Sequence, residues 1–238
     1  MQRLHDILER SERNGAAIGH FNVADTVLLK AVFSAARELE VPVLVGASGG
    51  ERQFIGVRQI AALVRSLREE FDFPIFLNAD HTHSLADAVE AAKAGFDSIV
   101  FDLSAQPFEQ NVRQTKEAVE ALKTINPTIL IEGEIGDIGT GSEIHEQAPD
   151  LSKGLTTPEE ARQFVESTGV DILAPAVGNM HGMLPSMIAT RIFINFPIQM
   201  EMILWGALIG AFVGFVGSAV PAWNARKVRV SDVFAKIA

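Results

Sequence analysis

The chain has 238 residues, enough to bury a full hydrophobic core, and a single α/β barrel of this size is ordinary. It contains no cysteine, so disulfide bonds and thiolate metal sites are excluded. Its net charge of −10 argues against a nucleic-acid partner, and residues 1–15 lack the apolar core of a signal peptide.

The charge is divided unevenly along the chain. Residues 191–238 hold five Lys and Arg against two Asp and Glu, so this segment has a net charge of +3. Because the whole chain carries −10, residues 1–190 must carry −13. Two segments of opposite net charge therefore follow one another in this sequence.

Short apolar runs alternate with helical patterns from residue 17 to about residue 178. The runs predict strands at 17–23, 41–48, 74–80, 98–102, 128–135 and 172–178. Apolar residues between them recur at helical spacing; one predicted helix is capped by Gly95, and another begins at Thr157 with Pro158 in its first turn. Continuous apolar strands that alternate with helices predict a parallel sheet covered on both faces.

Both an open doubly wound sheet and a closed (β/α)8 barrel fit this alternation. Polar residues lie at or next to the carboxyl ends of five different predicted strands: Asn22, Ser48, Asp80, Asp102 and Glu134. His181 follows the sixth strand by a few residues. In a barrel all these ends converge on one face, whereas in an open sheet most would be far apart. The sequence therefore predicts a TIM-type (β/α)8 barrel that is truncated after about six βα units.

A long apolar segment stands where the seventh and eighth βα units are expected. Residues 202–220 contain no charged side chain, and a helix of this length, at about 1.5 Å per residue, comes close to crossing a hydrocarbon core of roughly 30 Å. Gly206, Gly210 and Gly214 have the small-residue spacing of packed membrane helices. This predicts a transmembrane helix; the alternative is a buried helix of a soluble domain.

The polar residues at the strand ends include a candidate set of metal ligands. Two imidazoles and two carboxylates make up this set: His81, His181, Asp102 and Glu134. Nitrogen and oxygen donors without sulfur suit Zn²⁺ or a similar divalent ion. Asp80 lies next to the first imidazole and fits a general acid/base; its alternative role is to orient a ligand. We expect His83 and His145 to be solvated loop residues and His20 to pack or hydrogen-bond rather than bind metal.

Five motifs in order resemble the class II, metal-dependent fructose-bisphosphate and tagatose-bisphosphate aldolases. They are GHFNVAD (19–25), VLVGAS (43–48), NADHTHSLADAVEAAKAGFDSIVFDLS (78–104), IEGEIG (131–136) and AVGNMHG (176–182). The resemblance is colinear from about residue 4 to about residue 187. It implies zinc-assisted, reversible cleavage of fructose 1,6-bisphosphate or tagatose 1,6-bisphosphate to dihydroxyacetone phosphate and glyceraldehyde 3-phosphate.

The resemblance also implies roles for the metal-site residues. Asp80 matches the acid/base at the cleaved carbon, and His81 and His181 match zinc ligands. Asp102 and Glu134 match secondary metal positions, which leaves room for a second divalent ion beside the catalytic zinc.

Three further positions match the residues that hold the substrate in this family. Asn22 matches a substrate-contacting asparagine, while Ser48 and Gly182 match positions that hold the dihydroxyacetone phosphate portion. The implied partner is a phosphorylated ketose, and the resemblance suggests a cytoplasmic homodimer.

The chain also departs from the family pattern. The third zinc histidine belongs to a later glycine-rich segment of the HGGSG kind, and no histidine follows His181 here. The late Asn-x-x-Thr phosphate motif is absent, and the loop around Glu143, the residue that would correspond to a proton-transfer acid, is altered. His83 stands one residue past the position where the family usually has glycine. We therefore expect aldolase activity to be impaired in this chain.

Residues 203–238 resemble the last membrane helix and cytoplasmic end of an ABC-transporter permease subunit. The sequence thus predicts an incomplete aldolase-like barrel over 1–187 and a permease-like tail over 188–238, joined near residues 186–192. One alternative function is a membrane-anchored fusion with an inert barrel remnant, attached through the helix at 202–220. Another is a non-catalytic binding module that keeps only a phosphosugar pocket.

Overall fold

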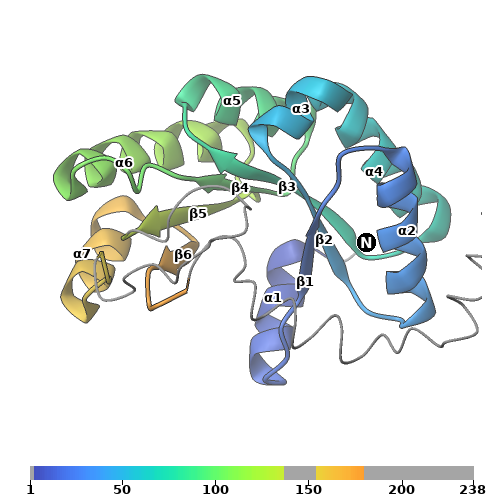
Figure 1. The fold of residues 1–238 in the computed structure, drawn as a ribbon, viewed down its shortest axis with the longest axis horizontal. Coiled ribbons are helices and arrows are strands. Elements are labelled where there is room, and N and C mark those ends of the chain that lie inside the picture. The colour runs from blue at the N-terminus through green and yellow to red at the C-terminus, as the bar shows by residue number, and fades with distance from the viewer. Residues whose placement is uncertain (1–2, 137–153, 180–238) are drawn as a thin grey trace, which may run out of the picture. The chain divides into compact units, whose positions relative to one another are not determined.

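A computed structural model describes residues 3–136 and 154–179 of the chain (Figure 1). Helices and strands alternate through these residues. In chain order they are α1 (Leu4–Arg13), β1 (Gly19–Asn22), α2 (Thr26–Glu38), β2 (Val43–Ala47), α3 (Gly49–Ile55), α4 (Val57–Phe71), β3 (Ile75–Thr82), α5 (Leu85–Ala94), β4 (Ser98–Phe101), α6 (Phe108–Ile125), β5 (Leu130–Ile135), α7 (Pro158–Thr168) and β6 (Ile172–Pro175).

The strands form one parallel sheet whose spatial order is the same as their order in the chain, from β1 to β6. All six predicted strands are confirmed. In a doubly wound sheet the strand order reverses at a switch point, whereas in a barrel each strand pairs with the next. The observed order is therefore that of a half-barrel, which is consistent with a truncated TIM barrel.

The larger part of the core lies between the sheet and the helices that surround it, α2 and α4 to α7 (Figure 1). Leu77, Ile99 and Ile131 are fully buried on the outer face of three successive strands. Phe33 of α2 and Leu122 of α6 belong to the same buried cluster. Since side chains alternate between the two faces of a strand, the neighbouring residues on each strand face the inside of the half-barrel.

A second, smaller cluster closes one end of the inner face. Leu4 and Ile7 of α1 pack against Phe76 of β3 and Leu130 of β5. These strand residues lie near the amino ends of their strands, so α1 forms an apolar floor. The inner face is therefore apolar at the floor, which leaves the carboxyl ends of the strands for polar side chains.

The helix ends agree with the predicted caps. Thr157 accepts a hydrogen bond from the amide of Glu160 and Pro158 occupies the first turn of α7, as the sequence predicted. Gly95 ends α5 with φ of +96°, a left-handed conformation that favours glycine.

Both edges of the sheet lack a second neighbour within the part of the chain that the structure describes. β1 pairs only with β2 there, β6 pairs only with β5, and all four residues of β1 are exposed. No helix within residues 3–136 and 154–179 is long and apolar enough to cross a membrane. The helix predicted at 202–220 lies outside the described residues.

Candidate metal and acid–base site

The polar residues predicted at the strand ends do meet at one end of the half-barrel. Each comes from a different strand or from the residue that directly follows it: Asn22 from β1, Ser48 after β2, Asp80 from β3, Asp102 after β4 and Glu134 from β5. This end lies opposite the apolar floor made by α1. The parallel arrangement of the strands thus assembles one polar site from residues that are far apart in the chain.

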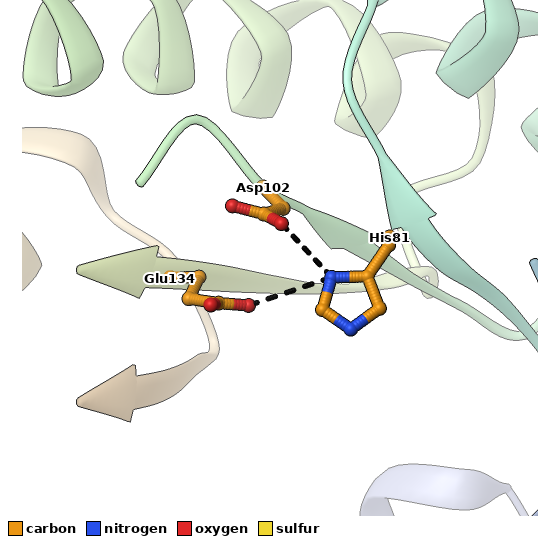
Figure 2. Close-up of side chains that lie close together, drawn as sticks. All are labelled: His81, Asp102 and Glu134. Atoms are coloured by element: carbon orange, nitrogen blue, oxygen red, sulfur yellow. Dashed lines mark hydrogen bonds and ion pairs between the residues drawn. The ribbon is translucent and has the colours of Figure 1, made fainter. Parts of the chain in front are cut away.

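Three of these side chains form a compact group that suits a metal ion. Figure 2 shows His81, Asp102 and Glu134 pointing toward one another; His81 lies on β3, Asp102 directly follows β4, and Glu134 lies on β5. His81 Nδ1 lies 2.9 Å from Asp102 Oδ2 and 3.7 Å from Glu134 Oε2, and the candidate ligand atoms all lie within 4.8 Å of one another. Ligand atoms around one tetrahedral zinc are about 3.3 Å apart, which lies between the two distances from His81 Nδ1, and the nitrogen and oxygen donors are of the type that zinc binds.

A backbone irregularity in β3 brings His81 to the same side as Asp80. Regular alternation would turn two consecutive side chains to opposite faces of the sheet. The register between β3 and β4 shifts between Ala79 and Thr82, and His81 has φ of +38°. The strand was predicted to end at residue 80, but it continues through this bulge to Thr82, where pairing with Phe101 resumes. Bulges that re-aim a side chain are frequent next to active sites.

Asp102 is held by the residue that lies two positions after it. Ser104 donates two hydrogen bonds to Asp102 Oδ1, from its backbone amide at 3.0 Å and from its hydroxyl at 2.7 Å. The other oxygen, Oδ2, faces His81. Burial raises the pKa of Asp102, but the hydrogen bonds from His81 and Ser104 outweigh this and keep the pKa well below its usual range.

The charges of the other two groups depend on this carboxylate. The hydrogen bond to Asp102 raises the pKa of His81 to about 9 against the opposing effect of burial. Burial, reinforced by the charge of Asp102, raises the pKa of Glu134 to about 7. In the metal-free protein at neutral pH, His81 is therefore protonated and Glu134 is partly so. A metal ion must displace these protons, because a ligand binds through its deprotonated form.

We expect the metal-free protein to lose stability as the pH rises from 6.5 to 9. The folded pKa of His81 lies above the unfolded value, so its contribution is fully present below 6.5 and is lost as the pH passes 9. At about 1.4 kcal/mol per pKa unit, the loss is on the order of 3 kcal/mol. Urea unfolding in EDTA at several pH values measures it, and His81→Gln should flatten the curve. An equally steep curve for the variant would contradict the assignment.

Asp80 lies beside this group and is oriented by a neighbour. Asn22 Nδ2 donates to Asp80 Oδ2 at 2.8 Å and approaches Glu51 Oε2 at 3.4 Å. Glu51 in turn accepts from the backbone amide of Ser48 at 2.6 Å, and Ser48 caps the start of α3. The carboxylate of Asp80 is thus positioned without being part of the metal cluster.

The remaining histidines fit the predictions only in part. His83 is mostly exposed, as expected, but its Nδ1 lies 2.9 Å from the backbone oxygen of Asp102. His20 is exposed on β1, and a Cβ atom at Gly46 would lie 2.3 Å from its Nε2. Neither residue belongs to the metal cluster found among the described residues. Four predicted residues lie outside the described part of the chain: Glu143, His145, His181 and Gly182.

Two buried polar side chains that the sequence analysis missed contact the backbone of the site. Asn111 of α6 donates to the carbonyl oxygen of Glu134 at 2.9 Å and accepts from Thr115 at 2.8 Å. Arg52 of α3 donates to the carbonyl oxygen of Asp80 at 3.0 Å. In the sequence, the only sign of these contacts was a polar residue, Asn111 or Arg52, at a helical position that was expected to face the core.

Sequence comparison relates the chain to known aldolases. The model of the family described as fructose-bisphosphate aldolase class II matches residues 2–203, which extends past the boundary predicted at residue 187. Over 177 residues the chain is 36% identical to a fructose-bisphosphate aldolase of Thermus caldophilus. This match covers 74% of the chain but only 57% of the relative, so the chain spans little more than half of that protein.

Solved structures give the same relationship. The YdjI aldolase from Escherichia coli K12 matches with a TM-score of 0.65 and 28% identity, over 83% of this chain and 70% of that one. A candidate fructose-1,6-bisphosphate aldolase from Coccidioides immitis matches with a TM-score of 0.63 and 30% identity, over 76% and 62%. With the strand order and the polar site, these matches show that the chain belongs to the class II fructose-bisphosphate aldolase family.

Proposed function

We propose that this chain carries the site of a zinc-dependent ketose-bisphosphate aldolase, which cleaves fructose 1,6-bisphosphate or tagatose 1,6-bisphosphate reversibly into dihydroxyacetone phosphate and glyceraldehyde 3-phosphate. The observation that carries the proposal is the juxtaposition of Asp80, oriented by Asn22, with the group formed by His81, Asp102 and Glu134. An aldol cleavage needs both elements, a base beside the breaking bond and a centre that stabilises the resulting negative charge.

The proposed zinc ligands are His81 and His181, with Asp102 and Glu134 as secondary positions that a second divalent ion could also use. The nitrogen and oxygen donors of His81, Asp102 and Glu134 support this choice. When bound, a divalent ion supplies Lewis acidity, which stabilises negative charge on the ketone side of the substrate. Ser104 supports the site by fixing the orientation of Asp102.

Asp80 is the proposed acid and base of the reaction. In the cleavage direction its carboxylate accepts the proton of the C4 hydroxyl, the C4–O bond becomes the aldehyde carbonyl, and the electron pair of the C3–C4 bond moves to the ketone half. In the synthetic direction the same carboxylic acid returns this proton. Asn22 holds the carboxylate in place, and Ser48 and Gly182 are proposed to contact the dihydroxyacetone phosphate portion.

Zinc content and cleavage activity, measured on the purified protein, test the proposal directly. We expect one weakly bound zinc per chain, and cleavage of fructose 1,6-bisphosphate that EDTA abolishes, at a rate far below that of the full-length Thermus relative. The rate should be low because a site that lacks the third histidine ligand holds zinc weakly and positions it poorly. Cleavage that persists in EDTA would exclude the mechanism, and a chain that binds no zinc would exclude the metal assignment.

We also propose that the aldolase-like part ends near residue 187 and that the segment 188–238 has a separate origin. The change from net negative to net positive charge and the uncharged run at 202–220 support this division. Separation of membrane and soluble fractions after expression tests whether the tail carries a membrane helix. A chain found entirely in the soluble fraction without detergent would exclude a membrane anchor.

A further inference from the structure

We propose that Arg52 is a positioning residue that fixes the carboxyl end of β3, so that Asp80 and His81 face the same site. The proposal deepens the function proposed above and rests on it, because it concerns the geometry of the same acid and the same metal ligand. Arg52 lies on α3, outside the sheet, and touches neither of the two side chains it would position.

The guanidinium of Arg52 joins the ends of two strands. Its Nη1 donates to the carbonyl oxygen of Ala47, the last residue of β2, and to that of Asp80 at 3.0 Å. Its Nη2 donates to Thr82 Oγ1 at 3.1 Å. The residues on both sides of His81 are therefore held by one rigid, planar group.

The backbone of β3 is irregular at the residues that Arg52 contacts. His81 has φ of +38°, and the register with β4 shifts across the same residues. Thr82 Oγ1 also lies 3.2 Å from the carbonyl oxygen of Ala79, so the bulge is closed by a small network that includes Arg52. Irregular backbone of this kind persists only where its surroundings determine it.

The burial of Arg52 is costly, which argues that its geometry matters. Arg52 is only 6% exposed, and its guanidinium hydrogen-bonds two carbonyl oxygens and one hydroxyl oxygen. A buried cation that hydrogen-bonds only carbonyl and hydroxyl oxygens stabilises a fold poorly compared with an apolar side chain of the same volume. Two of its three hydrogen bonds go to the residues on either side of His81, the carbonyl oxygen of Asp80 and the hydroxyl of Thr82, and the third goes to the end of β2.

Arg68 provides a matched control at the opposite end of the same strand. Its Nε donates to the carbonyl oxygen of Ile75 at 2.7 Å, and its guanidinium pairs with Asp97. Asp97 also accepts from the backbone amide of Leu77 at 2.7 Å. Arg68 thus hydrogen-bonds the amino end of β3, and no residue of the site lies at that end.

The experiment compares Arg52→Met, Arg52→Lys and Arg68→Met in the full chain. Zinc affinity, measured by competition with a chromophoric chelator, should fall about 10- to 100-fold in Arg52→Met, the range found for groups that orient metal ligands. It should stay within about threefold in Arg68→Met, although that variant loses its pair with Asp97. Arg52→Lys keeps the charge but not the planar fork of donors, so its affinity should lie between the wild type and Arg52→Met.

Hydrogen exchange of the metal-free proteins gives a second readout that needs no zinc. The amide of Asp102 donates to the carbonyl oxygen of Thr82 at 3.1 Å, so it should exchange faster in Arg52→Met and at the wild-type rate in Arg68→Met. Wild-type zinc affinity and exchange in Arg52→Met would overturn the proposal, as would equal losses in both methionine variants. If the wild type binds no zinc, the proposed function fails, and the exchange rates still decide the role of Arg52.

Discussion

Replacing His81 with alanine is expected to weaken zinc binding by at least about 100-fold. His81 supplies the only nitrogen donor of the cluster within the described part of the chain, where its partners are the carboxylates of Asp102 and Glu134. Structural zinc sites with four ligands bind with roughly 10–16 kcal/mol, so one ligand contributes about 3 kcal/mol, which is two orders of magnitude in affinity. Competition with a chromophoric chelator at fixed pH measures the difference.

His83→Ala is the matched control for this variant. His83 lies two residues further along the chain, and its side chain is mostly exposed. The centroids of the His81 and His83 rings are 6.3 Å apart. The Nδ1 atom of His83 lies 2.9 Å from the backbone oxygen of Asp102 and 3.8 Å from Asp102 Oδ2, but His83 is not one of the three residues of the cluster. We expect zinc affinity to change by less than threefold. A loss as large as that of His81→Ala would show that His83 is itself a ligand and that the ligand set proposed here is wrong.

The sequence was sufficient to predict the strands and the place of most site residues. A strand buried on both faces leaves a continuous apolar run, and the run ends where the chain leaves the core. The first polar residue after the run therefore marks the carboxyl end of the strand, as Asp102 does after β4. Because parallel strands place these ends together, side chains such as Asn22 and Asp80, far apart in the chain, could be expected to meet.

The irregular part of β3 could not be predicted in the same way. A bulge changes which face a side chain occupies without changing the apolar pattern that precedes it. The run at Ile75–Leu77 looks the same whether the strand ends at Asp80 or continues to Thr82. The sequence therefore placed His81 near the site, but only the structure explains how it faces the same way as its neighbour.

Buried polar contacts between elements were also beyond sequence reasoning. Arg52 reaches the backbone of β3 only because α3 follows β2 closely and packs beside β3, and Asn111 reaches Glu134 from the middle of α6. Such contacts depend on the relative positions of three elements at once, whereas periodicity reports only which face of one element is apolar. A charged residue on a short helix is ordinarily expected to be solvated.

Asp80→Asn is expected to lower kcat for fructose 1,6-bisphosphate cleavage by two to four orders of magnitude, the range that general acid–base groups contribute. The amide has the shape of the carboxylate, and its oxygen can still accept the hydrogen bond from Asn22, but it cannot take up the proton of the substrate hydroxyl. A coupled assay at saturating zinc measures the loss relative to the chelator-sensitive rate of the wild type.

Two comparisons separate this loss of proton transfer from a loss of structure. Zinc affinity should change by less than about threefold in Asp80→Asn, because Asp80 is not part of the metal cluster. Asn22→Ala leaves the carboxylate of Asp80 present but removes its orienting hydrogen bond of 2.8 Å, together with the contact of Asn22 with Glu51 and with the substrate, so kcat should fall by about tenfold, much less than in Asp80→Asn. If Asp80→Asn kept a tenth of the wild-type rate, or if Asn22→Ala were the slower variant, the base would have to be another group of this site.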